Sequence, residues 1–352
     1  MFYSTQKVAH LFSLPGMTGR TSEELINMAQ TGQLPPLVRG RGGLGWREKD
    51  IVTVGQQLSP LRRPHKPMVL TLFVTKGGVL KTTLSLNLAR QFALHGIKTL
   101  VIGLDLQGDV TTALGHQAIR QEDDLQQAMA ALDRTRGLYD YFGEHSGLDD
   151  LIQKTDLPTL DLIPETPELI ALDQELLLRP RREYWLKEKV TRPLLQRYDL
   201  IILDCSPNWN QLITNALVAT DFLLSPVECR INNYRNLKMF QGLVHQCRQD
   251  LSLTLQHGFV PTRLNPNRKL SREIGEWYRA KLPGCMESAI RESVQGEEAT
   301  AMNQSIPEFA ADSTSAEEVK QLLVEVWQLM ASGRREVKHS HNVDKETPWH
   351  LV

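Results

Sequence analysis

The chain has 352 residues, a length that allows two domains, or one large domain with an appendage. Apolar residues make up 41%, an ordinary fraction for a soluble globular protein, and no stretch approaches the roughly 18 apolar residues that a membrane span needs. Four widely spaced cysteines form no CxxC pair, which argues against a disulfide framework and a zinc site. The N-terminus shows no signal-peptide pattern, so we expect a cytoplasmic protein.

The formal net charge of −1 conceals an uneven distribution of charge. Residues 1–67 hold nine Lys and Arg residues against four Asp and Glu residues, so the rest of the chain carries a net charge of about −6. A small basic module on an acidic body indicates contact with nucleic acid. A solvated basic face is the alternative explanation of the same charge.

Residues 1–60 have the pattern of a compact helical module. We expect Thr5 to cap a first short helix. The segment Thr21–Glu24 (TSEE) is a capping box, in which the Thr hydroxyl and the Glu carboxylate satisfy each other's backbone amides. This capping box predicts a second helix over residues 21–31, and a third helix is expected from Lys49.

A glycine- and arginine-rich stretch, residues 39–47 (RGRGGLGWR), separates the second helix from the third. Two short helices, a turn and a basic hairpin-like loop resemble a MerR-like winged helix-turn-helix domain. In such a domain helix 21–31 would enter the major groove, and three arginines would contact phosphates or a groove edge: Arg39, Arg41 and Arg47. A small helical bundle with a loose loop is the alternative. Residues 61–67 are basic and contain two prolines, which predicts a linker.

From Met68 onward, short β-rich runs alternate with helical segments. The runs are residues 68–74, 99–104, 159–163, 199–204, 222–227, 254–261 and 285–290. Strands interleaved with helices predict an α/β fold, a doubly wound and mostly parallel sheet that helices cover on both faces. Apolar residues recur at helical spacing over 317–330, and the polar segment 333–352 is expected to be disordered.

A phosphate site is predicted between the strand at 69–74 and the helix that starts at Lys81. A loop that joins a strand to a helix N-terminus presents backbone N–H groups and the positive end of the helix dipole to an anion. Gly77 and Gly78 allow the backbone to approach a phosphate closely. We expect Lys81 to neutralise the β- and γ-phosphates and the Thr82 hydroxyl to ligate Mg²⁺.

The segment Lys76–Thr83 (KGGVLKTT) fails the strict pattern GxxxxGK[ST], because Thr75 and Leu80 occupy both glycine positions. It matches the deviant form KGGxxKTT and resembles the phosphate loop of the ParA/MinD family of ATPases. Further segments carry the same resemblance: residues 100–115 (LVIGLDLQGDVTTALG), 198–207 (YDLIILDCSP), 215–228 and 260–274. It extends over about residues 68–330 and implies a P-loop NTPase domain at 68–332, while the N-terminal module at 1–60 points to the plasmid type of this family.

The resemblance implies that the protein uses ATP and Mg²⁺, with nucleotide contacts from Lys76, Gly77, Gly78, Val79, Leu80, Lys81, Thr82 and Thr83. Lys76 would reach the phosphates of the partner in a nucleotide-sandwich homodimer and stabilise charge there, as an arginine finger does. Asp105 matches an aspartate that orients the attacking water, and Asp204 would hold the Mg²⁺ shell together with Thr82. Pro261 and Arg263 would line the base, and Arg291 would contact DNA non-specifically.

Three positions depart from the commonest pattern of the family: Leu80 for glycine, Gly103 for the first aspartate of the second motif, and Leu106 for proline. Leu80 is strained if its position needs a positive φ. Gly103 removes a carboxylate near the metal, and slow hydrolysis is the expected consequence.

The function that the resemblance implies is ATP-driven DNA partition. Two chains would close around ATP, bind DNA non-specifically on the nucleoid, and release it when a ParB-like centromere-binding protein stimulates hydrolysis. The N-terminal module would bind an operator and repress its own operon. A nucleotide-responsive repressor with little or no ATPase activity is the alternative. A MinD-like membrane ATPase would need a basic amphipathic C-terminal helix, and a nitrogenase-reductase type would need paired cluster cysteines; the sequence favours neither, and no membrane partner is expected.

Overall fold

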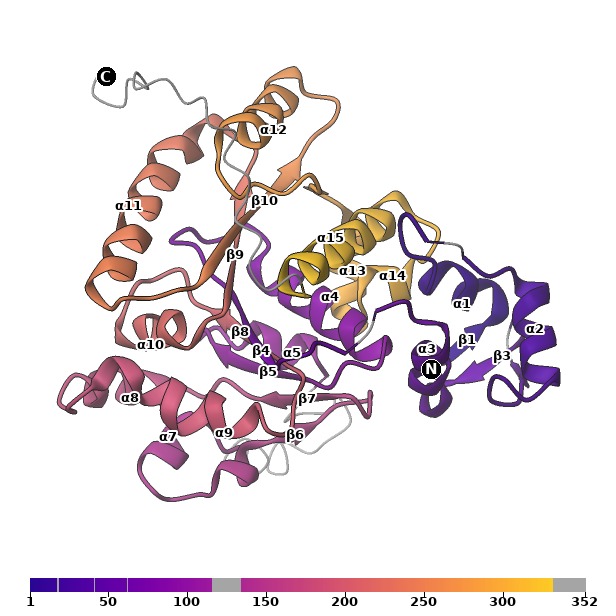
Figure 1. The fold of residues 1–352 in the computed structure, drawn as a ribbon, viewed down its shortest axis with the longest axis horizontal. Helices are drawn as coiled ribbons and strands as arrows, with labels where there is room; N and C mark the ends of the chain where they lie inside the picture. The colour runs from indigo at the N-terminus through magenta and orange to yellow at the C-terminus, as the bar shows by residue number, and fades with distance from the viewer. Residues whose placement is uncertain (18, 41, 62, 116–133, 332–352) are drawn as a thin grey trace.

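The computed structural model describes residues 1–17, 19–40, 42–61, 63–115 and 134–331 (Figure 1). Arg41 and the segment 333–352, which the sequence predicts to be a DNA contact and a disordered tail, lie outside the described residues. Within the described part of the chain, no helix is both long and apolar enough to cross a membrane.

One sheet of eight strands forms the centre of the molecule, in the order β11-β10-β9-β4-β8-β5-β7-β6. All neighbouring strands are parallel except β6 and β7, which confirms the predicted mostly parallel sheet. The strands are β4 (Met68–Leu72), β5 (Thr99–Leu104), β6 (Gln153–Lys154), β7 (Leu160–Ile163), β8 (Leu200–Cys205), β9 (Phe222–Glu228), β10 (Gln256–Leu264) and β11 (Ile290–Arg291).

The predicted strand at 285–290 is wrong in extent. Only β11 (Ile290–Arg291) pairs as a strand, and Cys285 forms an isolated bridge to Phe259. The backbone turns at Gly284, which has a φ of 79°, and the segment after it pairs with β10 only near its two ends, so no continuous strand forms. The two-residue strand β6 was not predicted, because it is too short to produce an alternating pattern.

Helices cover both faces of the sheet, because its central strands are buried on both sides. Leu200 and Ile202 of β8 face the cluster that includes α4 and α15, whereas Ile201 and Leu203 face the cluster that includes α8, α10 and α11. The helices are α4 (Lys81–Leu94), α5 (Asp109–Ala113), α7 (Leu138–Phe142), α8 (Leu169–Leu176), α9 (Arg192–Leu194), α10 (Gln211–Ala219), α11 (Tyr234–Asp250), α12 (Lys269–Lys281), α13 (Val294–Ala301), α14 (Ile306–Phe309) and α15 (Thr314–Ala331).

The first 58 residues form a separate small sheet with three helices, at the right of Figure 1. Its elements are β1 (Phe2–Ser4), α1 (Thr5–Leu11), α2 (Ser22–Gln30), β2 (Val38–Gly40), β3 (Gly43–Arg47) and α3 (Glu48–Leu58), with strand order β1-β3-β2. The capping box at α2 is confirmed, since Glu24 N–H donates to Thr21 Oγ1 at 3.2 Å and Thr21 N–H donates to Glu24 Oε2 at 2.8 Å. The predicted cap of α1 is wrong by one residue: Ser4 is extended and its Oγ accepts from Lys7 N–H at 3.2 Å, while Thr5 is already helical.

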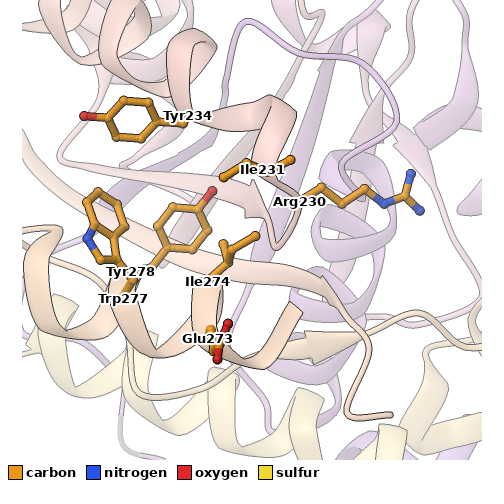
Figure 2. Close-up of a pocket in the computed structure, with 7 residues that line it drawn as sticks. All are labelled: Arg230, Ile231, Tyr234, Glu273, Ile274, Trp277 and Tyr278. Atoms are coloured by element: carbon orange, nitrogen blue, oxygen red, sulfur yellow. The ribbon is translucent and has the colours of Figure 1, made fainter. Parts of the chain in front are cut away.

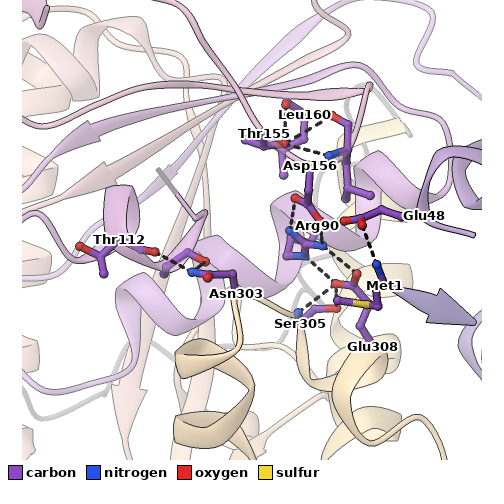
Figure 3. Close-up of polar contacts among 12 residues, drawn as sticks. Met1, Glu48, Arg90, Thr112, Thr155, Asp156, Leu160, Asn303, Ser305 and Glu308 are labelled. Carbon is purple, nitrogen blue, oxygen red and sulfur yellow. Dashed lines mark hydrogen bonds and ion pairs between the residues drawn. The ribbon is translucent and has the colours of Figure 1, made fainter. Parts of the chain in front are cut away.

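This N-terminal unit shares one continuous hydrophobic core with the large domain. Tyr3, Trp46 and Ile51 belong to the same cluster of buried side chains as Leu94 and Leu322. A buried polar network reinforces the contact between the two parts. Figure 3 shows the centre of this network, where Arg90 contacts Asp156 and Glu308.

Arg90 of α4 is the centre of that network and is fully buried. Its guanidinium donates to both carboxylate oxygens of Glu308, at 2.7 and 2.9 Å, and to both oxygens of Asp156, at 2.7 and 2.8 Å. Tyr3 Oη, from the N-terminal unit, donates to Glu308 Oε1 at 3.0 Å. The buried carboxylate of Glu308 therefore links α4, the helix that follows the phosphate loop, to the N-terminal unit.

Candidate nucleotide-binding site

The loop between β4 and α4 lies at the carboxyl edge of the sheet, where α/β proteins bind their ligands. Gly77 and Gly78 face open space, because a Cβ built on either residue would meet no atom within 4 Å. Gly78 has a φ of 68°, a conformation that a side chain would strain. The backbone of this loop is therefore open to a ligand at the N-terminus of α4.

Leu80 is the N-cap of α4 and has a φ of 72° and a ψ of 25°. The position does need the left-handed conformation, which costs a non-glycine residue roughly 1–2 kcal/mol. Leu80 also packs against the large core cluster as a partly buried side chain, and this contact offsets part of the strain.

Lys81 is the first residue of α4 and is buried. Its Nζ donates to the carbonyl oxygen of Lys76 at 3.2 Å. Burial lowers the pKa of the Lys81 ammonium, and the nearby carboxylates of Asp204 and Asp105 oppose that shift. An anion beside this ammonium would gain a strong electrostatic interaction, because little water surrounds it.

Asp204 lies near the end of β8 and is fully buried. Thr82 Oγ1 donates to its Oδ2 at 2.9 Å, and Ser85 Oγ donates to its Oδ1 at 2.6 Å. Burial raises the pKa of Asp204 to about 6, against the effect of these two donors. The structure thus brings together Thr82 and Asp204, as the resemblance implied, and adds Ser85, which the sequence analysis missed although it lies one turn after Thr82.

The donor set around Asp204 fits a hydrated Mg²⁺ bound with a nucleotide. Its groups are hydroxyl and carboxylate oxygens, which are the ligands that Mg²⁺ prefers. Among the described residues, no group of three or more His, Cys, Asp and Glu side chains could hold a metal ion. Such a site suits an ion that is held by one or two side chains together with phosphate oxygens and water.

Asp105 directly follows β5 and is partly exposed beside this site. Its Oδ1 accepts from the backbone N–H of Gln107 at 3.3 Å, and its carbonyl oxygen accepts from Gly108 N–H at 3.1 Å. Asp105 is close enough to Lys81 and Asp204 to contribute to the shifts in their pKa values. The structure therefore places Asp105 at the same edge as the phosphate loop.

Lys76 forms an ion pair with Glu228, the last residue of β9. Glu228 is buried and also pairs with Arg230, at 3.1 Å, and with Arg263, at 4.0 Å. The sequence analysis missed Glu228 as a site residue. A carboxylate at the carboxyl end of a largely apolar strand was the signal that could have identified it.

Pro261 and Arg263 lie in β10 beside Glu228. Pro261 is opposite Val227 of β9, and Arg263 has a φ of 50° and pairs with Glu292 at 3.4 Å. Neither lines the nearby cavity of about 480 Å³. That cavity is drawn in Figure 2 and is bounded by Arg230, Ile231, Tyr234, Glu273, Ile274, Trp277 and Tyr278.

The residues predicted to contact DNA lie far apart in the fold. Arg39 and Arg47 are both exposed, but their register and the alternation of side chains place them on opposite faces of the small sheet. Arg291 Nε donates to Glu318 at 2.6 Å in the large domain. The exposed residues of α2 are Glu23, Glu24, Asn27 and Gln30, so this helix presents no basic side chain to solvent.

A doubly wound parallel sheet with a glycine loop and a buried lysine at the start of the following helix defines a P-loop NTPase. A family model described as an AAA domain matches residues 68–256. The chain belongs to this family and, within it, to the ParA-type partition ATPases. It is 29% identical over 244 residues to the chromosome partitioning protein ParA of Myxococcus xanthus, an alignment that covers 69% of this chain and 75% of that protein.

Two solved structures share the fold. A plasmid partition protein of Borrelia burgdorferi bound to AMPPNP has a TM-score of 0.62 and 22% identity, over 75% of this chain and all 100% of that chain. The cobyrinic acid a,c-diamide synthase of Mycobacterium smegmatis, bound to an ATP analogue and magnesium, has a TM-score of 0.60 and 22% identity, over 76% of this chain and 97% of that chain.

Proposed function

We propose that this protein is an ATPase that partitions DNA, and that the segment Lys76–Thr83 binds the triphosphate. The observation that carries the proposal is the joining of Lys81, Thr82 and Asp204 at the N-terminus of α4, beside an open glycine loop. The AMPPNP in the Borrelia protein and the ATP analogue and magnesium in the Mycobacterium protein support the choice of ligands.

Each residue of the site has a chemical task in this proposal. The N–H groups from Gly77 to Thr83 and the Lys81 ammonium hold the β- and γ-phosphates. Thr82 and Asp204 hold the hydrated Mg²⁺, which neutralises charge on the phosphates when it is bound. Asp105 orients the attacking water, and a partner subunit's Lys76 stabilises the charge that develops on the phosphoryl group.

The biological cycle follows from the same site. Two chains dimerise around ATP, bind DNA non-specifically through a surface that includes Arg291, and are released when a ParB-like protein stimulates slow hydrolysis. Such a protein works in the cytoplasm on the nucleoid. The relationship to a chromosome partitioning protein supports this cycle.

The N-terminal unit has a second role in the proposal. Residues 1–60 would act as a winged helix-turn-helix domain joined by 61–67 to the ATPase domain at 68–332, and would bind an operator for autorepression. The helices α1 and α2 followed by the hairpin β2–β3 support this reading. Arg39 and Arg47, with Arg41, would supply its phosphate contacts, and Pro261 with Arg263 would flank the base.

ATPase activity measured with and without DNA tests the proposal. We expect phosphate release by the wild type, stimulation by DNA together with a ParB-like protein, loss of nucleotide binding in Lys81→Ala, and retained binding without turnover in Lys76→Ala. A nucleotide-responsive repressor is the competing function, and it would bind operator DNA without any phosphate release. Absence of phosphate release under all these conditions would favour that repressor.

A further inference from the structure

Gly103 occupies a place in β5 where a side chain would point into the nucleotide site. The register of the sheet sets it directly opposite Asp204 of β8. A Cβ built on Gly103 would lie 2.1 Å from Cδ of Glu165 and 2.5 Å from its Oε1. The carboxyl group of Glu165 therefore fills the volume that any side chain at position 103 would need.

Glu165 comes from a different element, the loop between β7 and α8, and its side chain is buried. One of its oxygens is fixed: Oε2 accepts from the backbone N–H of Thr111 at 3.1 Å and from the Thr111 hydroxyl. The backbone N–H of Glu165 donates in return to Thr111 Oγ1 at 3.1 Å. Thr111 lies in α5, the short helix that follows the loop of Asp105.

The other oxygen of this carboxylate is left without a donor. Within the described residues, Oε1 of Glu165 is buried and has no hydrogen-bond partner. A buried polar atom without a partner costs about 1–3 kcal/mol, so a hydrogen bond from water or a ligand at this oxygen would be strongly favourable. The negative charge of Asp204 is near enough to act on this group, so the unpaired oxygen lies beside the site proposed for the hydrated Mg²⁺.

We propose that Glu165 supplies, from the loop after the neighbouring strand β7, the carboxylate that the second motif lacks at Gly103. Oε2 holds Thr111 and with it the loop that carries Asp105, and Oε1 accepts a hydrogen bond from water around the magnesium–nucleotide complex. Glu165 is thus a positioning residue of the ATPase site. This inference rests on the proposed function, because it assigns a group to that same site.

Because a side chain at position 103 would overlap the Glu165 carboxyl group, the inference can be tested by moving the carboxylate from position 165 to position 103. Gly103→Asp alone places a new Cβ against the Glu165 carboxyl group, so the variant should be destabilised. Gly103→Asp combined with Glu165→Ala removes the overlap and moves the carboxylate back to β5. Glu168→Ala is the matched control, because Glu168 is an exposed carboxylate three residues further along the same segment.

The experiment measures the Mg²⁺ concentration that half-saturates binding of a fluorescent ATP analogue, the thermal midpoint without nucleotide, and phosphate release. Loss of a group that orients a metal's ligands typically costs 10–100-fold in metal affinity or activity. We expect Glu165→Ala and Glu165→Gln to raise the half-saturating Mg²⁺ concentration about tenfold or more, and Glu168→Ala to leave it unchanged. The double variant should return it to within about threefold of the wild type.

Glu165→Gln separates charge from packing, because it keeps the shape of the side chain and the fold should tolerate it. Suppose that the wild type hydrolyses ATP and that Glu165→Gln has the same half-saturating Mg²⁺ concentration. That result would overturn this inference and leave the proposed function intact. If the double variant needs as much Mg²⁺ for half-saturation as Glu165→Ala, a carboxylate at position 103 does not replace Glu165, and the inference is overturned. A wild-type chain that binds no nucleotide would overturn the proposed function, and this inference with it.

Discussion

Lys76 and Glu228 form an ion pair at the carboxyl edge of the sheet, although 152 residues separate them in the chain. The side chain of Lys76 is therefore directed toward β9 of its own chain. In the proposed dimer the same ammonium must contact the partner's phosphates, so it has to leave Glu228. Arg230 and Arg263 remain beside Glu228 after such a change, and they would compensate its buried charge.

The first prediction concerns this ion pair. Glu228→Gln removes the competing partner of Lys76, and we expect the dimer to form at lower protein concentration in the presence of a non-hydrolysable ATP analogue. A partly exposed pair contributes up to about 1 kcal/mol, and a dimer breaks two such pairs, so the dissociation constant should fall by up to about 30-fold. Analytical ultracentrifugation measures that constant. Glu292→Gln is the control, since Glu292 pairs with Arg230 and Arg263, and equal effects of the two variants would contradict the prediction.

The second prediction concerns Asp105. Asp105→Ala should bind ATP with nearly wild-type affinity and lose about 100-fold or more of its phosphate release, because a positioned carboxylate that assists a water contributes about 10²–10⁴-fold. Single-turnover phosphate release and equilibrium nucleotide binding measure the two effects separately. Asp109→Ala, an exposed carboxylate at the start of α5, should behave as the wild type. Unchanged phosphate release in Asp105→Ala would remove Asp105 from the mechanism.

The third prediction concerns the buried pair of Arg90 and Glu308. Arg90→Leu leaves the Glu308 carboxylate buried and uncompensated, so the free energy of unfolding should fall by about 3–5 kcal/mol. Tyr3→Phe removes one hydrogen bond to Glu308 and should cost about 1 kcal/mol. Urea unfolding measures both changes. A loss below about 1 kcal/mol in Arg90→Leu would show that the buried pair does not stabilise the fold, and an unchanged free energy of unfolding in Tyr3→Phe would show that Glu308 does not hold the N-terminal unit.

The fourth prediction is a pH dependence of stability. Burial lowers the pKa of His95 to about 3 from its ordinary 6.5, so the unfolded chain takes up a proton below pH 6.5 that the folded chain refuses. His95 therefore reduces the free energy of unfolding by about 1.4 kcal/mol per pH unit as the pH falls from 6.5 toward 3. Because Phe12 and Ser59 of the N-terminal segment contact its ring, we expect acid to loosen this interface.

Urea unfolding of the wild type and of His95→Gln between pH 5 and 7 checks the slope. The buried carboxyl group of Asp204, whose pKa is raised to about 6, acts in the opposite direction in both proteins, so the difference between them isolates His95. Identical slopes would show that His95 is not buried as a neutral ring.

The fifth prediction concerns DNA binding by the hairpin β2–β3. If Arg39 contacts a phosphate, Arg39→Ala should make the negative slope of the log DNA-association constant against log salt concentration shallower by about 0.9. The variant should bind operator DNA and random DNA more weakly to a similar extent. Arg47 is on the opposite face of the small sheet, so Arg47→Ala should change this slope less. Fluorescence anisotropy over a salt series measures both variants, and equal slopes for all three proteins would exclude Arg39 and Arg47 as phosphate contacts.

Much of the fold could be predicted from local patterns. The capping box at Thr21, the largely apolar strand β5 and the glycine loop before Lys81 each depend on residues close together in the chain, and each lies where the pattern indicated. The conformation of Leu80 did not follow from the sequence, which left open whether its position needs a positive φ; the structure shows a φ of 72° there.

The amino-acid sequence by itself determined the alternation of strands and helices, the phosphate loop and the aspartates that end two parallel strands, because period, caps and turns are short-range properties of the chain. Only the tertiary structure decided that Glu228 pairs with Lys76, that Glu165 fills the space beside Gly103, and that Tyr3 shares Glu308 with Arg90. These contacts join residues more than 60 positions apart, and they depend on strand order, register and the way helices pack on the sheet. No local pattern encodes that information, since many sequences with the same periodicity would bring different side chains together.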